Sequence, residues 1–171
     1  MSVNVSGVQL RAGFAERVVG ILMETGVKPE QLELEITETF LMQHLHHASD
    51  ELIKLTELGV SIAIDDFGTG YSSLSQIKQL PIETIKVDRS FVGDIVDDPD
   101  DRAIVGAVIA MGKELKLTLL SEGIETERQH RLINALGSDK AQGYFYSRPV
   151  YSSKIPVVSE EINQKLVGLV G

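Results

Sequence analysis

The chain has no cysteine among its 171 residues. This absence excludes disulfides, thiolate metal sites and cysteine nucleophiles, and it agrees with a cytoplasmic location. Basic residues are also few, because 16 Lys and Arg stand against 25 Asp and Glu, a net charge of −9. A surface that binds nucleic acid polymers is therefore not expected. No apolar run approaches the roughly 18 residues of a membrane span, so no membrane contact is expected.

The overall composition predicts one folded domain. Hydrophobic residues make up 43% and charged residues 24%, which is ordinary globular usage. The chain has no linker rich in Pro, Gly and Ser and no low-complexity tract. We therefore expect a single domain over residues 1–171, in which any anionic ligand would bind through a metal ion.

A short apolar run rich in β-branched residues, then a loop, then an amphipathic helical stretch recur along the chain. Runs of this kind are typical of strands buried in a parallel sheet. The six predicted strands are Ser2–Ser6, Leu32–Glu38, Ser61–Asp66, Thr84–Asp88, Leu117–Glu122 and Ala141–Ser147.

The helical stretches carry hydrophobic stripes and end signals. They run from Phe14 to a stop at Gly26, from Leu41 through Leu55 to Gly59, from an acidic start at Asp98 through Leu115, from Thr126 to Gly137, and through Ile162 and Leu169 after Pro156, with a shorter piece in Ser72–Leu80. Alternating strands and helices predict an α/β fold with a parallel sheet and right-handed crossovers. An open doubly wound sheet and a (βα)₈ barrel both remain possible, although six strands are too few for a complete barrel.

Polar side chains stand at the carboxyl ends of the predicted strands, where both architectures bind ligands. Oxygen donors without Cys or a His pair favour Mg²⁺, Mn²⁺ or Ca²⁺ over zinc. The adjacent Asp65 and Asp66 could hold two ions about 3.5–4 Å apart, which would clamp a phosphodiester. So many carboxylates would repel one another unless cations lay among them. The set comprises Asn4, Glu35, Asp65, Asp66, Lys86, Asp88, Glu122 and Gln142.

Each of these features also has a plainer interpretation. A single acidic residue at a strand end is more often a helix cap or a solvated loop residue, but six such ends in register are harder to explain that way. Gly68 and Gly70 lack the third glycine of a dinucleotide fingerprint and are not followed by a Walker lysine, which favours a mobile loop with a metal ligand at its base. Solvent-exposed positions are predicted for His44, His46, His47, His130 and the acidic run Asp94–Asp101.

Six ordered segments resemble the signature segments of the EAL-domain cyclic di-GMP phosphodiesterases. The resemblance runs from Val3 to about Pro149 and implies a (βα)₈ TIM-type barrel that hydrolyses cyclic di-GMP to linear pGpG with Mg²⁺ or Mn²⁺ in bacterial signalling. The segments are VNVSGVQL, LELEITE, IAIDDFGTGYSSL, IKVDRSFV, SEGIET and AQGYFYSRP.

The resemblance also implies a metal site. Asn4, Glu35 and Asp65 match metal ligands of the family, with Asp65 in the bridging place. Asp66 matches the ligand of the second ion.

Four further residues match family positions with other roles. Lys86 corresponds to the lysine that orients the attacking water, and Glu122 to a glutamate proposed as an acid/base residue. Gln142 corresponds to a glutamine that contacts substrate. Glu38 corresponds to the glutamate that braces the loop Asp65–Leu74.

The Glu-Ala-Leu segment that names the family is absent from this chain. The resemblance therefore implies an N-terminally truncated EAL domain, an incomplete barrel of about six βα units that lacks about its first quarter. Homodimers are expected through the Asp65–Leu74 loop or the open barrel edges. The main alternative function is a non-catalytic receptor for cyclic di-GMP or a dimerisation scaffold, and a weaker one is an unrelated sugar-phosphate barrel.

Overall fold

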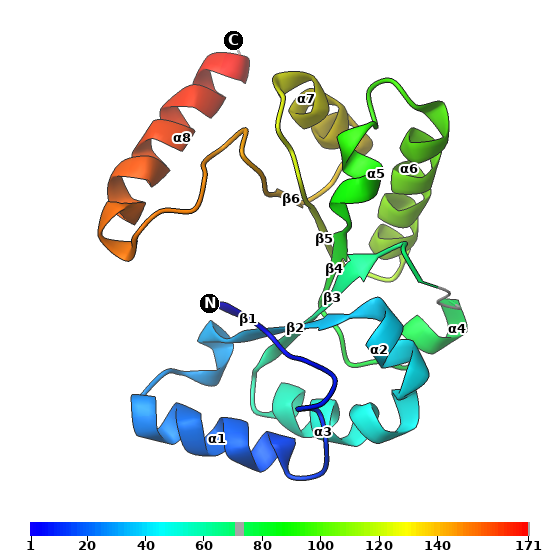
Figure 1. The fold of residues 1–171 in the computed structure, drawn as a ribbon, viewed down its shortest axis with the longest axis vertical. Helices are drawn as coiled ribbons and strands as arrows, with labels where there is room; N and C mark the ends of the chain where they lie inside the picture. Colours follow the sequence, from blue (N-terminus) through cyan, green and yellow to red (C-terminus); the bar gives the residue numbers. More distant parts are fainter. Residues whose placement is uncertain (71–73, 171) are drawn as a thin grey trace.

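A computed structural model describes residues 1–70 and 74–170 of the chain. Its centre is one parallel sheet whose six strands lie side by side in chain order (Figure 1). Every strand pairs with the next one along the chain, and the sheet curves as half of a barrel. The strands are β1 Ser2–Asn4, β2 Glu33–Thr37, β3 Ser61–Phe67, β4 Thr84–Val87, β5 Thr118–Ser121 and β6 Lys140–Ala141.

Helices occupy the crossovers between the strands. Figure 1 shows α1, α2 and α3 on one side of the half-barrel, α5, α6 and α7 on the other, and α8 apart from both groups. The α-helices are α1 Phe14–Thr25, α2 Glu38–Gln43, α3 Leu45–Glu57, α4 Leu74–Ile77, α5 Arg89–Gly93, α6 Pro99–Glu114, α7 Glu127–Leu136 and α8 Ile155–Val170, with 3₁₀ turns η1 Pro29–Gln31 and η2 Ser152–Lys154.

The core lies between the central strands and the helices that cover them. Ile64 on β3, Ile85 on β4 and Leu119 on β5 are fully buried. All four residues of β4 are buried, whereas the three residues of β1 and the two of β6 are exposed. In the described part of the chain, β1 and β6 each pair on one side only, so the sheet is open at both edges.

The helix signals of the sequence act as predicted at several ends. Gly26 and Gly137 follow α1 and α7 in the left-handed conformation that glycine adopts without steric cost. The Asp98 side chain accepts the backbone N–H of Asp100 at the start of α6. Thr126 forms the predicted capping box that begins α7.

The last predicted strand, Ala141–Ser147, is wrong in its extent. Only Lys140 and Ala141 pair with β5, and residues 143–146 form a turn. The turn packs so closely on the loop after β5 that a Cβ atom at Gly143 would lie 2.0 Å from the carbonyl oxygen of Ile124. This tertiary contact overrides the strand preference of the aromatic residues.

Two helix predictions also need correction, and one short helix was missed. The stripe Leu41–Leu55 is divided between α2 and α3, because the backbone leaves the helical conformation at His44. The short helix α5 was not predicted; Asp88 caps it by accepting the backbone N–H of Ser90 at 2.9 Å. The last helix begins at Ile155, just before Pro156 instead of after it. In the described part of the chain, no helix has both the length and the apolar character needed to cross a membrane.

Candidate active site at the carboxyl ends of the strands

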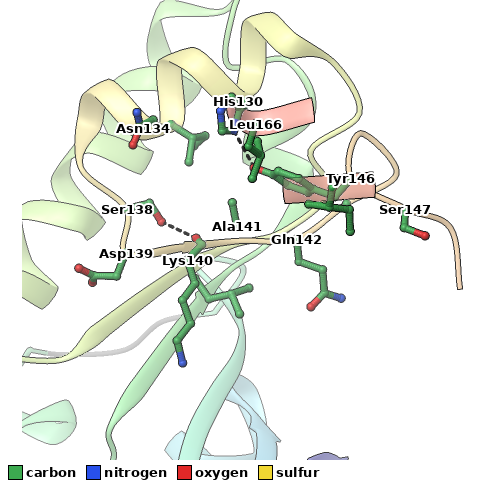
Figure 2. A pocket seen from close by; sticks show the side chains of 14 residues that line it. His130, Asn134, Ser138, Asp139, Lys140, Ala141, Gln142, Tyr146, Ser147 and Leu166 are labelled. Carbon is green, nitrogen blue, oxygen red and sulfur yellow. Dashed lines mark hydrogen bonds between the residues drawn. The ribbon is translucent and has the colours of Figure 1, made fainter. Parts of the chain in front are cut away.

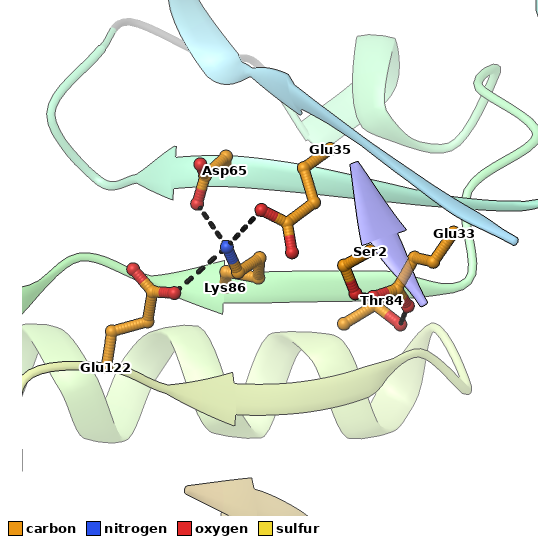
Figure 3. A network of polar contacts seen from close by, with 7 residues as sticks. All are labelled: Ser2, Glu33, Glu35, Asp65, Thr84, Lys86 and Glu122. Carbon is orange, nitrogen blue, oxygen red and sulfur yellow. Dashed lines mark hydrogen bonds and ion pairs between the residues drawn. The ribbon is translucent and has the colours of Figure 1, made fainter. Parts of the chain in front are cut away.

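Lys86 on β4 lies at the centre of three carboxylates (Figure 3). Its Nζ is 2.8 Å from Glu35 Oε2, 2.9 Å from Asp65 Oδ1 and 2.9 Å from Glu122 Oε1. The lysine side chain is 6% exposed, and the three carboxylates are between 11% and 18% exposed. The sequence prediction that a cation must lie among these carboxylates is thus met by a side chain of the protein itself.

A β-bulge brings the aspartate pair to this position. Ile64 pairs with Ile85 and Phe67 with Val87, so two residues of β3 stand opposite the single residue Lys86. Those two residues are Asp65 and Asp66. A bulge of this kind redirects side chains and often lies beside a functional site.

The contacts among Lys86 and its three carboxylate partners shift the pKa values of the side chains. Burial opposes the charge on Lys86, but its three carboxylate partners outweigh burial and raise the pKa of the ammonium well above its ordinary value. Burial raises the pKa of Glu122, although Lys86 acts in the opposite direction. Asp65 Oδ1 is buried, and among the described residues its contact is the ion pair with Lys86.

Asp66 interacts with the side chain of Asp88. Its backbone has a φ of 54°, in the left-handed region that residues other than glycine seldom adopt. Burial raises the pKa of its carboxyl group, and the charges of Asp65 and Asp88 raise it further. Burial acts in the same sense on Asp88, but hydrogen bonds from Ser90 outweigh it and lower the pKa of Asp88. Asp66 is therefore the member of this carboxyl pair that takes up a proton first.

Glu38 lies close to this group but makes different contacts. It is the buried first residue of α2, and its Oε2 accepts the backbone N–H of Gly68 at 2.8 Å and of Gly70 at 3.1 Å. The carboxylate thus holds the beginning of the loop that follows β3. The rest of the predicted loop includes residues 71–73, which lie outside the described residues.

Asn4 and Gln142 lie toward the two open edges of the sheet. Asn4 is exposed on β1 and stands in register with Glu35 on β2. Gln142 follows β6, and its backbone carbonyl accepts the N–H of Ile124 at 3.0 Å. Its exposed side chain lines a hollow bordered by β6, α7 and α8 (Figure 2).

His130 is not the surface residue that the sequence predicted. It is partly buried at this hollow, and its Nδ1 lies 2.8 Å from the hydroxyl oxygen of Tyr146 (Figure 2). Its ring stacks on Phe145. No local sequence pattern predicts these contacts, because the two partners lie 15 and 16 positions further along the chain. Of the three other histidines, His44 is exposed as predicted, and the side chains of His46 and His47 lie outside the described residues.

The residues present suit a divalent cation in their chemistry. Glu35, Asp65 and Glu122 offer oxygen atoms only, and they already surround one positive charge. Asp65 also offers a buried oxygen atom, Oδ1, whose contact is the ion pair with Lys86. In the described part of the chain, no three His, Asp or Glu side chains are arranged as a ready-made ion site, and the ammonium group of Lys86 occupies the middle of the carboxylates.

Comparison with known proteins agrees with this geometry. The family model described as "EAL domain" matches residues 1–149. This chain belongs to the EAL-domain family. The resemblance seen in the sequence is thereby confirmed, as is the incomplete barrel of six parallel strands.

A curated protein and its solved structure are similar to most of this chain. The bifunctional diguanylate cyclase/cyclic di-GMP phosphodiesterase MucR of Pseudomonas aeruginosa is 39% identical over 156 residues, which are 91% of this chain and 23% of MucR. The solved complex of the MucR phosphodiesterase with cyclic di-GMP has a TM-score of 0.87 and covers 90% of this chain and 63% of its own.

Two further solved structures have the same fold. The EAL domain of Mycobacterium smegmatis DcpA has a TM-score of 0.87 at 43% identity, with coverage of 93% of this chain and 72% of its own. The complex of Klebsiella pneumoniae BlrP1 with manganese and cyclic di-GMP has a TM-score of 0.80 at 31% identity. The match covers 86% of this chain and 38% of the BlrP1 chain. This chain spans about a fifth of the length of the curated relatives that it matches.

Proposed function

We propose that this EAL chain carries most of the site of a phosphodiesterase that hydrolyses cyclic di-GMP to linear pGpG with a divalent metal ion, Mg²⁺ or Mn²⁺. The observation that carries the proposal is the convergence of Glu35, Asp65 and Glu122 on Lys86 at the carboxyl ends of the strands. Similarity to a phosphodiesterase solved with cyclic di-GMP, and to a protein solved with manganese and cyclic di-GMP, supports it.

The ligands proposed for the metal are Asn4, Glu35, Asp65 and Asp66. Metal ions bound by these oxygen atoms would supply Lewis-acid stabilisation of the phosphodiester and lower the pKa of water. Asp65 suits a bridging position because it is next to Asp66 in the β-bulge and points toward Glu35 and Lys86.

The remaining residues have roles that follow from their chemistry. The Lys86 ammonium group is a donor that can orient the attacking water and stabilise negative charge. Burial raises the pKa of Glu122, which makes its carboxylate a better proton acceptor at neutral pH than an exposed glutamate. Glu38 fixes the backbone of the loop after β3, and Gln142 offers an exposed amide group to the substrate.

The test is a measurement of cyclic di-GMP binding by calorimetry and of pGpG formation by chromatography, with Mg²⁺ or Mn²⁺ added. Two proteins are compared: the 171-residue chain, and a longer form that adds the part of the solved EAL domains that this chain does not cover. We expect turnover by the longer form and hydrolysis near background by the short chain, because its sheet is open at β1 and β6.

Asp65→Asn in the longer form should abolish turnover and leave the fold intact, whereas Asp97→Asn, at an exposed site between α5 and α6, should have no effect. Binding without turnover by the longer form would favour the receptor interpretation and contradict the proposed enzyme. Self-association through the loop at residues 65–74 or through the sheet edges stays a prediction, which sedimentation of both forms would test.

A further inference from the structure

The position of the Lys86 ammonium group bears on how a metal ion could enter the site. Its Nζ contacts Glu35 Oε2 and Asp65 Oδ1 at 2.8 and 2.9 Å, and these two residues are proposed metal ligands. The lysine side chain is almost fully buried, so water competes little for these contacts. The ammonium group therefore takes up the centre of the three carboxylates.

An ion and the ammonium group cannot both hold Glu35 Oε2 and Asp65 Oδ1 at the centre of the three carboxylates. Oxygen ligands lie about 2.0–2.1 Å from Mg²⁺. An ion that binds Glu35 Oε2 and Asp65 Oδ1 would lie in the place of Nζ or within a few ångströms of it. Two cations so close together repel strongly where water is largely excluded.

The ammonium group also has a role of its own when no metal is bound. Without it, Glu35, Asp65 and Glu122 would leave three carboxylates close together and between 11% and 18% exposed. Like charges in such surroundings destabilise the folded state unless protons or cations neutralise them. Lys86 supplies that neutralising charge from within the chain.

We propose that Lys86 is the internal counter-cation of the metal-free site, and that a divalent cation displaces its ammonium group from Glu35 and Asp65. This inference rests on the proposed function for the existence of the metal site. It adds that the lysine is released as the ion binds, so that the site exchanges one cation for another. The stability of the metal-free protein and its metal affinity are then set by the same side chain in opposite directions.

Lys86→Met tests the exchange in the 171-residue chain, with Lys140→Met as the matched control. Lys140 is an exposed lysine on β6, the second strand from β4 in the sheet. Thermal unfolding is measured with a chelator and with Mn²⁺, and Mn²⁺ affinity is measured by calorimetry. We expect Lys86→Met to lower the midpoint without metal, to show a larger rise with Mn²⁺ than the parent chain, and to bind Mn²⁺ at least about tenfold more tightly. Lys140→Met should change neither quantity.

A second measurement needs no variant and covers the case in which Lys86→Met fails to fold. The ammonium protons of a buried, ion-paired lysine exchange slowly and give an NMR signal of their own. Titration of the parent chain with Mg²⁺ should shift or broaden the Lys86 signal and leave the backbone amide signal of Lys140, on exposed β6, unchanged. A Lys86 signal that stays constant while Mg²⁺ binds would overturn the inference.

The failure of this inference can be told apart from failure of the proposed function. If the parent chain binds Mn²⁺, Glu35→Gln weakens that binding, and Lys86→Met leaves it unchanged or weaker, the metal site stands and the displacement is wrong. If neither the parent chain nor the longer form binds a divalent ion in a manner that depends on Glu35, both proposals are wrong.

Discussion

Glu38 and Gly70 are in direct contact although they are 32 positions apart in the chain. The carboxylate accepts the Gly70 N–H at 3.1 Å, and a Cβ atom at position 70 would lie 2.9 Å from Glu38 Cδ. The same oxygen atom accepts the Gly68 N–H at 2.8 Å. One buried side chain therefore fixes the backbone that directly follows Asp65 and Asp66.

Glu38→Ala should loosen this loop without unfolding the domain. Each hydrogen bond to a charged acceptor contributes about 1.5–3 kcal/mol, so amide exchange at Gly68 and Gly70 should become at least about tenfold faster. Hydrogen exchange measured by NMR checks this. Glu33→Ala, on β2 beside Ser2 and Thr84, is the control and should leave both amides protected. Unchanged exchange in Glu38→Ala would show that the loop is held by other contacts.

Lys86→Ala in the longer form should lower kcat far more than it weakens substrate binding. A group that acts on the attacking water contributes mainly in the transition state, and such losses are typically about 10²–10⁴-fold. Steady-state kinetics with cyclic di-GMP, combined with binding to a non-hydrolysable analogue, separate the two effects. An unchanged kcat with weaker binding would make Lys86 a phosphate contact instead.

Glu51 should make stability depend on pH below about 5. Its buried carboxylate accepts the backbone N–H of Ala15 at 2.8 Å and pairs with Lys54 at 2.9 Å. The hydrogen bond from Ala15, followed by the contact with Lys54, lowers its pKa in the folded state. A lowered pKa gives stability that is present above the ordinary glutamate value of about 4.3 and is lost as the pH falls through the folded-state value.

Glu51→Gln should therefore lower the free energy of unfolding by about 1 kcal/mol at pH 7, and the difference from the parent chain should shrink between about pH 5 and pH 3. Urea denaturation across this range measures it. The exposed Glu57 on the same helix provides the control, since Glu57→Gln should give no pH-dependent difference. A difference that grows as the pH falls would contradict the assignment.

Gly143→Ala should destabilise the turn that directly follows Gln142. The added Cβ would lie 2.0 Å from the oxygen and 2.3 Å from the nitrogen of Ile124, both of which are backbone atoms that cannot move aside easily. We expect a loss of about 1–3 kcal/mol, measured by thermal unfolding. Gly20→Ala, inside α1 with no atom within 4 Å of the new Cβ, should instead stabilise by about 0.5–1 kcal/mol. Equal effects of the two substitutions would rule out the close contact as the cause.

Local patterns in the sequence were enough to predict the alternation of strands and helices. The buried strands are short runs rich in β-branched and apolar residues. Helix ends are marked by contacts within a few residues, at Gly26, Gly137, Asp98 and Thr126. Since parallel strands end at a common rim, the sequence also predicted that Glu35, Asp65, Lys86 and Glu122 would gather at one end of the sheet.

Only the tertiary structure decided how these residues meet. The β-bulge that sets Asp65 and Asp66 opposite Lys86 arises from pairing between β3 and β4, and no local pattern announces it. The same holds for the short last strand and for His130, whose surroundings come from segments brought together by folding. The sequence predicted that a cation was needed among the carboxylates; the packing of three strands around Lys86 determined that, in this protein, the lysine supplies it.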